Sequence, residues 1–333
     1  MTSSQPYDLL ITGGKIITMD AERRVIEGGA IAIKGNSIQS ILTAAEIPQN
    51  IQAQRVIDAK NKVIIPGLIN AHSHIAMTLF RGFVEDLVLY KWLERVWQYE
   101  LSALNEASVR AGSGLAFSEL IRSGVTCVHD MYWHYMVTID LAEEIGFRLI
   151  GGPPLTSIGD PDFDEMVAIT RGVLEQIKDY KFINPIIQAH STYTTTPEMM
   201  HKVLEFKQEY QIPFTTHASE NQAEVNDVSE QYGKTPIELL QSYGLLDNST
   251  VLAHCVKLQD HEIDLLSDSG TSVAHCPESN LKFGCGIARV ADMIEAGVNV
   301  CIGTDGAASN NDLDVLGEIR TADGFNSLSD TYK

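Results

Sequence analysis

The feature that most constrains the fold is a regular alternation, from Val63 onward, of short apolar runs with segments of helical periodicity. Eight β-rich runs follow one another: VIIPGLINAHSH (63–74), VTCVHD (125–130), FRLIGG (147–152), NPIIQAH (184–190), PFTTHAS (213–219), TVLAHC (250–255), TSVAHC (271–276) and NVCIGTD (299–305). Between most of them the apolar residues recur with helical spacing, as in ASVRAGSGLAFSELIRSG and PEMMHKVLEFKQEY. Apolar strands joined by helical crossovers predict a parallel sheet covered on both faces. Eight such units predict an α/β fold of the (β/α)8 TIM-type barrel class, and a doubly wound open sheet is the structural alternative.

The residues before this alternation have a different pattern. Short β-type runs separated by glycine-containing turns predict a small β unit over residues 1–62, followed by the barrel over residues 63–333. Nothing in the first 62 residues has the character of a catalytic group. We therefore expect the chemistry to lie in the second domain.

Charge and cysteine usage limit the partners. The chain has 44 acidic against 24 basic residues, a formal net charge of −20, so its surface repels nucleic acid and anionic membranes. No apolar stretch approaches the ~18 residues that cross a bilayer, and MTSSQPYDLLITGGK lacks the pattern of a secretory signal. The five cysteines are odd in number and have no C-x-x-C spacing. These features predict a cytoplasmic protein with reduced thiols and without nucleic acid or membrane as a partner.

Polar residues stand where the predicted strands end. His72 and His74 close the first run, and later strand ends carry His129, Asp130, His190, His217, His254, His275 and Asp305. In a barrel these ends form one rim, where active sites are built. Residues i and i+2 of a strand face the same side, so His72 and His74 can bind one ion while Ser73 faces away.

The group formed by His72, His74, His217, His254 and Asp305 indicates a metal site. A single histidine is more often a hydrogen-bonded core residue than a metal ligand. That explanation would have to hold independently for each of these residues, whereas one metal site accounts for all of them. Nitrogen and oxygen ligands without thiolate suit Zn²⁺, with Fe²⁺ and Mn²⁺ as alternatives. A catalytic zinc lowers the pKa of its bound water to about 7.

Glu220 is the candidate proton donor. It follows His217 in THASE, in the loop above the predicted rim, where a carboxylic acid can deliver a proton to a substrate nitrogen. The alternative for a lone loop glutamate is a solvated surface charge. The chain has no HExxH, no phosphate-binding G-x-x-x-x-G-K-[ST] and no G-x-S-x-G. The residues alone thus predict a metal-activated water and a carboxylic acid.

Several blocks resemble the amidohydrolase superfamily, in particular its methylthioadenosine/S-adenosylhomocysteine deaminase branch, which is related to the s-triazine hydrolases. The blocks occur in the order of that branch: PGLINAHSHIAMTLFRG, HSTYTTTPE, THASENQAEV, LAHCV, VAHCPESNLKFGCG and GTDGAASNNDLD. The resemblance extends to about residue 320. It implies a (β/α)8 barrel with a small N-terminal β-sandwich unit.

The resemblance also implies roles for individual residues. His72, His74, His217 and Asp305 would hold one divalent metal ion, and Asp305 would take the proton of the attacking water. His254 would orient or polarise that nucleophile.

The substrate contacts are implied in the same way. Glu220 would bind the substrate ring and protonate the nitrogen beside the carbon under attack, His190 would hydrogen-bond the base, and Glu100 would hold sugar hydroxyls. The implied reaction is hydrolytic deamination of a purine nucleoside or a related amino-heterocycle, which releases ammonia.

The sequence departs from the resemblance at two places, and each departure leaves an alternative function possible. Where relatives carry arginines that meet the ribose or tail, this chain has GGPPLTSIGDPDFDE (151–165). An s-triazine-type dechlorinase or a cyclic-amide hydrolase is therefore an alternative.

The second departure is that the chain ends at Lys333, 28 residues after Asp305. We therefore expect a partial last helix and an incomplete β-sandwich unit, and a truncated, inactive paralogue serving as a binding or assembly subunit is a further alternative. Relatives are commonly oligomeric, so the resemblance implies a homo-oligomer.

Overall fold

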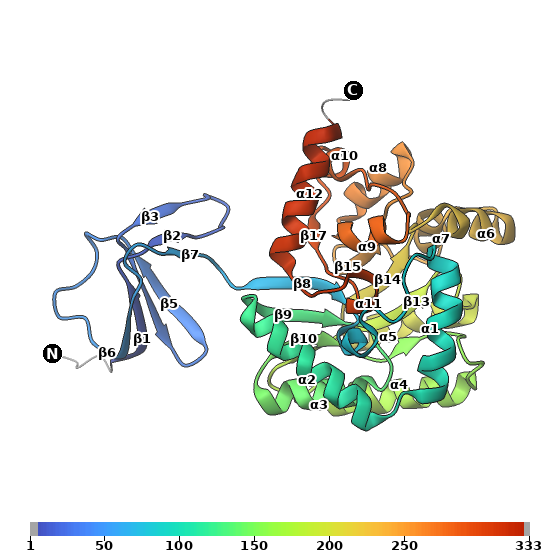
Figure 1. Ribbon diagram of the computed structural model, residues 1–333, viewed down its shortest axis with the longest axis horizontal. Coiled ribbons are helices and arrows are strands. Elements are labelled where there is room, and N and C mark those ends of the chain that lie inside the picture. Colours follow the sequence, from blue (N-terminus) through green and yellow to red (C-terminus); the bar gives the residue numbers. More distant parts are fainter. Residues whose placement is uncertain (1–5, 330–333) are drawn as a thin grey trace. The chain divides into compact units, whose positions relative to one another are not determined.

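The computed structural model describes residues 6–329, and these fall into two compact units that divide after Gly67. The first unit contains two small sheets, with strand orders β5-β4-β1-β6 and β3-β2-β7 (Figure 1). Its strands are β1 (Tyr7–Thr12), β2 (Lys15–Ile17), β3 (Val25–Glu27), β4 (Ala30–Lys34), β5 (Ser37–Leu42), β6 (Ala53–Asp58) and β7 (Val63–Ile64).

The first unit contains two small clusters of buried apolar side chains. Leu10, Ala30 and Ala32 form one buried cluster, and the other consists of Ile16, Ile26 and Ile31. Residues on one side of a strand alternate with residues on the other, so β4 contributes side chains to both clusters. None of the candidate catalytic residues lies in this unit.

The second unit is built on parallel strands. They are β8 (Leu68–Ser73), β9 (Val125–Asp130), β10 (Arg148–Gly151), β11 (Pro154–Leu155), β12 (Ile183–Pro185), β13 (Ile187–Ser191), β14 (Phe214–Ala218), β15 (Thr250–His254), β16 (Ser272–His275) and β17 (Val300–Ile302). One sheet has the order β12-β10-β9-β8 and the other the order β11-β13-β14-β15-β16-β17. Every neighbouring pair in both sheets is parallel.

The two sheets are joined at both of their sides. On one side the N–H of Asp305, just after β17, donates to the carbonyl of His72 in β8 at 3.0 Å. On the other side the chain passes directly from β12 to β13 through Ile186, whose N–H donates to the carbonyl of Gly151 in β10 at 3.3 Å. The carboxyl ends of strands from both sheets are thereby held close together.

Helices lie outside these strands (Figure 1). They are η1 (Ile75–Phe80), α1 (Leu89–Ala103), α2 (Glu106–Arg122), α3 (Tyr135–Ile145), α4 (Phe163–Ile177), α5 (Pro197–Tyr210), α6 (Gln222–Tyr232), α7 (Pro236–Ser242), α8 (Asp260–Ser269), α9 (Pro277–Lys282), α10 (Val290–Glu295), α11 (Ala307–Asn310) and α12 (Val315–Ser329).

Helix α5 shows how the sequence sets these elements. The side chain of Thr196 accepts a hydrogen bond from the N–H of Met199, and Pro197 occupies the first turn, where its missing N–H costs nothing. Met200, Val203 and Phe206 then recur at helical spacing and are buried against the strands. Burial of each such side chain contributes roughly 1.5–3 kcal/mol.

The strands follow the predicted runs closely, with two divisions. Run 63–74 is split at Pro66 and Gly67: β7 pairs with β2 in the first unit, whereas β8 belongs to the second. Run 184–190 was predicted as one strand, but it is divided between β12 and β13 at Ile186. The pairing of β12 with β10 ends at Pro185, opposite Gly151, the last residue of β10, and Ile187 begins the pairing with β14.

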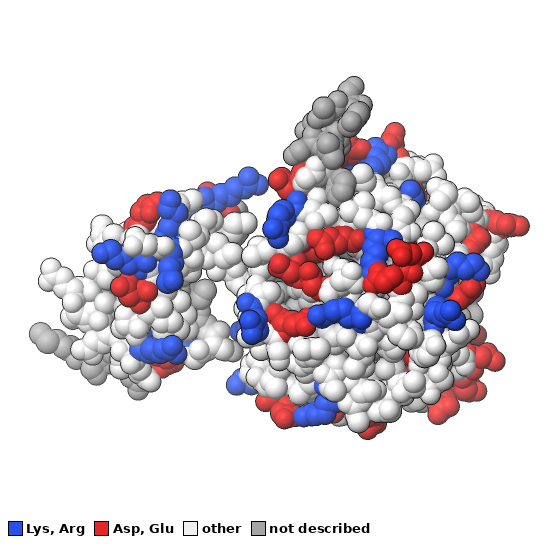
Figure 2. Space-filling model, in the orientation of Figure 1, with Lys and Arg blue, Asp and Glu red and all other residues white. Residues whose placement is uncertain are grey.

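Acidic and basic side chains are interspersed over the face of the second unit in Figure 2, so that face carries no single patch of one sign. Within residues 6–329 no helix is both long enough and apolar enough to span a membrane. All five cysteines are free, and Cys255, Cys276 and Cys285 are buried.

Candidate active site

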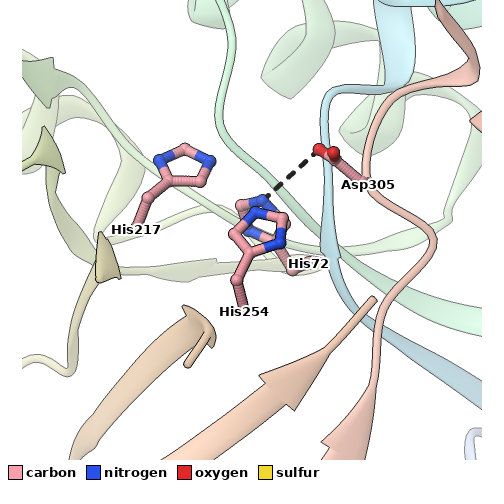
Figure 3. A group of neighbouring side chains, drawn as sticks. All are labelled: His72, His217, His254 and Asp305. Atoms are coloured by element: carbon pink, nitrogen blue, oxygen red, sulfur yellow. Dashed lines mark ion pairs between the residues drawn. The ribbon is translucent and has the colours of Figure 1, made fainter. Parts of the chain in front are cut away.

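Strand ends in the second unit bring four histidines and one aspartate together. His72 lies in β8 and His74 directly after it, His217 lies in β14, His254 ends β15, and Asp305 follows β17. One ligand atom from each of His72, His217, His254 and Asp305 lies within 4.8 Å of the other three, and Figure 3 shows these side chains converging from different strands. Nε2 of His74 lies 3.2 Å from Oδ1 of Asp305 and 3.3 Å from Nε2 of His217. The structure thus brings all four predicted ligands together, with His254 among them.

Two of the imidazoles are held in the tautomer that binds metal. Nδ1 of His74 is hydrogen-bonded to the carbonyl of Met131, and Nδ1 of His217 to the carbonyl of His190. A carbonyl oxygen only accepts, so each Nδ1 carries a proton and Nε2 is the nitrogen left to face an ion. Backbone carbonyls hold metal-ligating histidines in the same way.

His72 gives the clearest sign that an ion belongs here. Its ring is buried, and neither ring nitrogen has a hydrogen-bond partner among the described residues. Nε2 lies 3.7 Å from Oδ1 of Asp305, a contact drawn dashed in Figure 3 that is an ion pair only when the ring is protonated. Burial lowers the pKa of His72 to about 3, so its ring is neutral at pH 7. A buried polar ring without a partner is costly, and a divalent cation would satisfy it. The donor set therefore fits a metal ion.

Asp305 directs one carboxylate oxygen to the histidines and the other to hydroxyl groups. Oδ2 accepts hydrogen bonds from Ser279 at 2.6 Å and Ser309 at 2.8 Å. Burial on its own would raise the pKa of Asp305, but contacts with His72 and His74 outweigh it and hold that pKa well below its usual range. Burial likewise disfavours the charged form of His74, yet the contact with Asp305 raises the pKa of His74 to about 9. A metal cation bound between them would take the place of that proton.

Glu220 lies beside the cluster in a form suited to donate a proton. Its side chain is buried, and Oε1 lies 3.8 Å from Nε2 of His254. Burial, together with the charges of Asp305 and Glu224, raises the pKa of Glu220 well above its ordinary value. The protonated, neutral carboxyl is therefore favoured, which is the state that a general acid needs.

The loop that carries Glu220 is held by Glu224, a residue to which the sequence did not draw attention. Its carboxylate accepts the N–H of Ser219 at 3.1 Å, the N–H of Glu220 at 2.7 Å and the hydroxyl of Thr192 at 2.9 Å. Ser219 has a φ of 52°, a left-handed conformation that is costly outside glycine. The available signal was an acidic residue in the first turn of α6, where a carboxylate commonly meets free N–H groups.

His254 is oriented by Asn280, which the sequence also left unmarked. Nδ1 of His254 lies 2.9 Å from Oδ1 of Asn280, so Nδ1 donates and Nε2 is left to face Glu220. Burial lowers the pKa of His254, which favours the neutral ring. The φ angles of His254 and Asp305 are 73° and 57°. Such strained backbone at two strand ends is typical of functional sites, where it aims a side chain.

A cavity adjoins the cluster, and aromatic side chains make up much of its wall. Its lining includes the candidate residues His74, His190, His217, His254, Glu100, Glu220 and Asp305, together with Trp92, Trp97, Tyr132, Trp133, Tyr193 and Phe283. Flat apolar walls with a few convergent polar groups suit a planar heterocycle. The aromatic residues were missed from the sequence because each lies on a helix or loop whose neighbours are set only by the fold.

The two remaining predicted substrate contacts, Glu100 and His190, line this same cavity. The carboxylate of Glu100 accepts the hydroxyl of Tyr132 at 2.6 Å and the indole N–H of Trp133 at 3.0 Å. Burial raises the pKa of Glu100 despite these hydrogen bonds. Nδ1 of His190 lies 2.8 Å from the hydroxyl of Thr194, and burial lowers the pKa of His190 to about 3. His190 is therefore a neutral ring at the cavity wall.

Comparison with known proteins identifies the family of the chain. Residues 63–326 match the Amidohydrolase family. The chain is 38% identical over 321 residues to a 5-methylthioadenosine/S-adenosylhomocysteine deaminase of Syntrophobacter fumaroxidans. The aligned region covers 96% of this chain and 73% of that relative. The crystal structure of an adenosine deaminase from Xanthomonas campestris with bound zinc superposes with a TM-score of 0.91 at 34% identity, over 96% of this chain and 73% of that one. A triazine hydrolase from Arthrobacter aurescens, with a TM-score of 0.89 and 23% identity over 94% of this chain and 75% of that one, shares the fold.

The chain therefore belongs to the amidohydrolase family, a class of hydrolases with an α/β fold. The family expected from the sequence blocks is confirmed.

Proposed function

We propose that the protein is a metal-dependent aminohydrolase that converts the amino-bearing ring carbon of a purine nucleoside into a carbonyl and releases ammonia. The observation that carries this proposal is the buried Glu220, whose raised pKa favours the proton-bearing form, next to His254 in an aromatic cavity that ends at the histidine–aspartate cluster. Two similar proteins, a 5-methylthioadenosine/S-adenosylhomocysteine deaminase and an adenosine deaminase, bear the names of such enzymes.

The architecture that we propose is a closed (β/α)8 barrel formed by the second unit and a small β-sandwich formed by the first, with the division after Gly67 instead of residue 62. Two features support closure: the hydrogen bond from Asp305 to His72 between the two parallel sheets, and the direct passage of the chain from β12 of one sheet to β13 of the other at Ile186. In a closed barrel all the strand ends that bear candidate residues face one cavity.

The metal ligands in this proposal are His72, His74, His217 and Asp305. Three imidazoles and one carboxylate suit a single divalent ion, with Zn²⁺ as the first choice. The bound zinc of the Xanthomonas campestris deaminase supports that choice. When bound, the ion would supply a water activated near neutral pH.

The protein's own groups handle the protons. Asp305 is ionised and accepts the first water proton, and Ser279 and Ser309 hold its carboxylate in place through Oδ2. His254, favoured in its neutral form, accepts a hydrogen bond at Nε2 and so orients the attacking water. Glu220 gives its proton to the ring nitrogen beside the carbon under attack, and the electrons of the ring C–N double bond move onto that nitrogen.

Collapse of the tetrahedral carbon completes the reaction. The proton held by Asp305 passes to the amino group, which leaves as ammonia when its C–N bond breaks. The second proton of the water returns to Glu220 as the new C–O bond becomes a carbonyl. Both carboxyl groups are thereby restored for the next cycle.

The remaining contacts position the substrate. Glu100 would accept hydrogen bonds from the ribose hydroxyls, and His190 would bind the base at Nε2. Glu100→Gln is expected to raise KM for adenosine more than KM for any free base that is turned over, because a free base has no sugar hydroxyls. Equal effects on both would contradict the assignment of Glu100 to the ribose.

The test is ammonia release by metal-replete protein. The panel is adenosine, 5′-deoxyadenosine, methylthioadenosine, S-adenosylhomocysteine, guanine, cytosine and an aminotriazine. Glu220→Gln is expected to lower kcat at least about 10²-fold while the metal content is unchanged. Glu198→Gln, on the exposed first turn of α5, is the matched control and is expected to keep the wild-type kcat. Absence of ammonia from every adenine nucleoside, or release of chloride from a chlorotriazine instead, would contradict the proposal.

A further inference from the structure

A second cavity adjoins the active cavity. Trp133, Pro154 and Thr156 line both cavities, so the two share a wall. The rest of the second cavity is formed largely by the segment before α4 and by the first turns of that helix, including Asp162 and Glu165. The stretch that departs from the family resemblance, residues 151–165, thus borders a space next to the candidate active site.

Trp133 of the shared wall is hydrogen-bonded to Glu100, the residue that we propose binds the ribose hydroxyls. The indole N–H of Trp133 donates to Oε2 of Glu100 at 3.0 Å, and the hydroxyl of Tyr132 donates to Oε1 at 2.6 Å. A ribose held by Glu100 would therefore lie beside Trp133, and the second cavity is the space that adjoins this wall.

The second cavity is suited to an apolar group and is unfavourable for an anion. Neither cavity has a lysine or an arginine among its described lining residues, and the charged groups that line the second one are the carboxylates of Asp162 and Glu165. The N-terminus of α4, the positive end of the helix dipole, is already capped by a carboxylate, because the side chain of Asp162 accepts the N–H of Glu165 at 2.8 Å. Trp133, Pro154 and Ile169 supply apolar surface.

We propose that the second cavity receives the 5′ substituent of the nucleoside and that it selects apolar substituents over those with a net negative charge, such as a phosphate. This inference rests on the proposed deaminase function. A thioether or methyl group gains from burial against the apolar wall. A phosphate would lose its hydration beside two like charges without a cation to pair with.

The first test compares kcat/KM for 5′-deoxyadenosine, 5′-methylthioadenosine, S-adenosylhomocysteine and adenosine 5′-monophosphate. We expect kcat/KM for 5′-methylthioadenosine to exceed that for adenosine 5′-monophosphate, whose 5′ group carries only negative charge, by about tenfold or more, the discrimination typical of one mismatched group. Glu165→Arg should raise kcat/KM for adenosine 5′-monophosphate relative to 5′-methylthioadenosine by about threefold or more, the range of an exposed charge pair.

Asp164→Arg is the matched control for that variant. Asp164 is exposed on the same first turn of α4 but does not line either cavity, so its reversal of charge should leave the ratio unchanged. Equal use of all four nucleosides by the wild type would overturn the proposal, and so would equal responses of Glu165→Arg and Asp164→Arg.

A second test asks whether the substituent occupies the cavity at all. Ile169 lines the second cavity and is 48% exposed, so Ile169→Trp fills space there without disturbing the core. The ratio of kcat/KM for 5′-methylthioadenosine to that for 5′-deoxyadenosine should fall about tenfold, the effect of blocking a pocket for one small group. Ile145→Trp, at an exposed position that lines neither cavity, should leave the ratio unchanged.

The outcomes separate this inference from the function on which it rests. Deamination of adenosine without discrimination among the 5′ substituents, or an unchanged ratio in Ile169→Trp, would overturn the inference alone. No deamination of any adenine nucleoside would overturn the proposed function and the inference together.

Discussion

Ser279 donates a 2.6 Å hydrogen bond from its hydroxyl to Oδ2 of Asp305, and this contact turns Oδ1 of the carboxylate toward the histidines. Ser279 lies on α9, and a second donor, Ser309, lies on α11 and reaches the same oxygen at 2.8 Å. Two short helices that follow different strands thus fix one carboxylate from the side away from the candidate metal.

Removal of the first of these donors tests that role. Ser279→Ala leaves Oδ2 of Asp305 with one hydroxyl and lets the carboxylate rotate. We expect zinc affinity to fall about tenfold, the usual effect of losing a partner that orients a metal ligand. Competition with a chromophoric chelator measures the affinity. Ser118→Ala, at an exposed position in α2, is the control, and an equal affinity in the two variants would show that the hydroxyl does not orient Asp305.

The close approach of β17 to β8 predicts a strong effect at Gly303. A Cβ added there would lie 2.8 Å from both the N and the O of His72, so the two chain segments would have to separate. Gly303→Ala is expected to lower the free energy of unfolding by roughly 1–3 kcal/mol through overpacking and to weaken metal binding, because His72 moves with its backbone.

The opposite sign is expected for the same substitution in a helix. Gly172 lies inside α4, and an added Cβ there has no heavy atom within 4 Å among the described residues. Gly172→Ala should therefore raise the free energy of unfolding by roughly 0.5–1 kcal/mol. Urea titrations of the two variants and the wild type give both values. A Gly303→Ala protein as stable as the wild type would show that the contact with His72 can relax.

Much of the site could be predicted because it is encoded locally. Strand periodicity predicts that His72 and His74 face the same side, and the position of His217, His254 and Asp305 at later strand ends needs only the alternation of strands and helices. The same local patterns gave most strand positions. They failed inside run 184–190, where the chain changes its pairing partner at Ile186 from β10 to β14 and so passes from one sheet to the other.

The residues that could not be predicted act through tertiary contacts. Glu224, Ser279, Asn280 and Ser309 are ordinary polar residues of helices, and each gains its role from a hydrogen bond to a group on another segment or across a turn. A single sequence shows the identity of such residues but not their partners.

The state of Glu220 predicts the pH dependence of catalysis. A general acid must carry its proton, and activity is lost as the pH rises through its pKa. Because burial and neighbouring carboxylates raise the pKa of Glu220, kcat should remain high through the ordinary carboxyl range of about 4.3 and decline only at a higher pH. A profile of kcat against pH from 4 to 10 measures this. A decline that begins near pH 4.3 would contradict protonation of Glu220 in the complex.

Glu318 predicts how stability depends on pH. Its side chain on α12 is fully buried, one oxygen accepts the N–H of Glu278 at 3.1 Å, and the other accepts the side-chain amide of Asn310. Burial raises the pKa of Glu318 to about 9. The folded value thus lies above the unfolded value of about 4.3, so stability is fully present below the unfolded pKa and is lost as the pH rises toward about 9.

Glu318→Gln removes the charge and keeps a side chain of the same size. Its free energy of unfolding should exceed that of the wild type by on the order of a few kcal/mol at pH 9, and the difference should shrink toward pH 5. The effect should extend to the site, because the same Asn310 amide donates to the carbonyl of Thr304 at 2.7 Å, next to Asp305. Urea titrations at pH 5, 7 and 9 measure the difference, with Glu198→Gln as the exposed control. A constant difference at all three pH values would show that Glu318 does not become charged in the folded protein over this range.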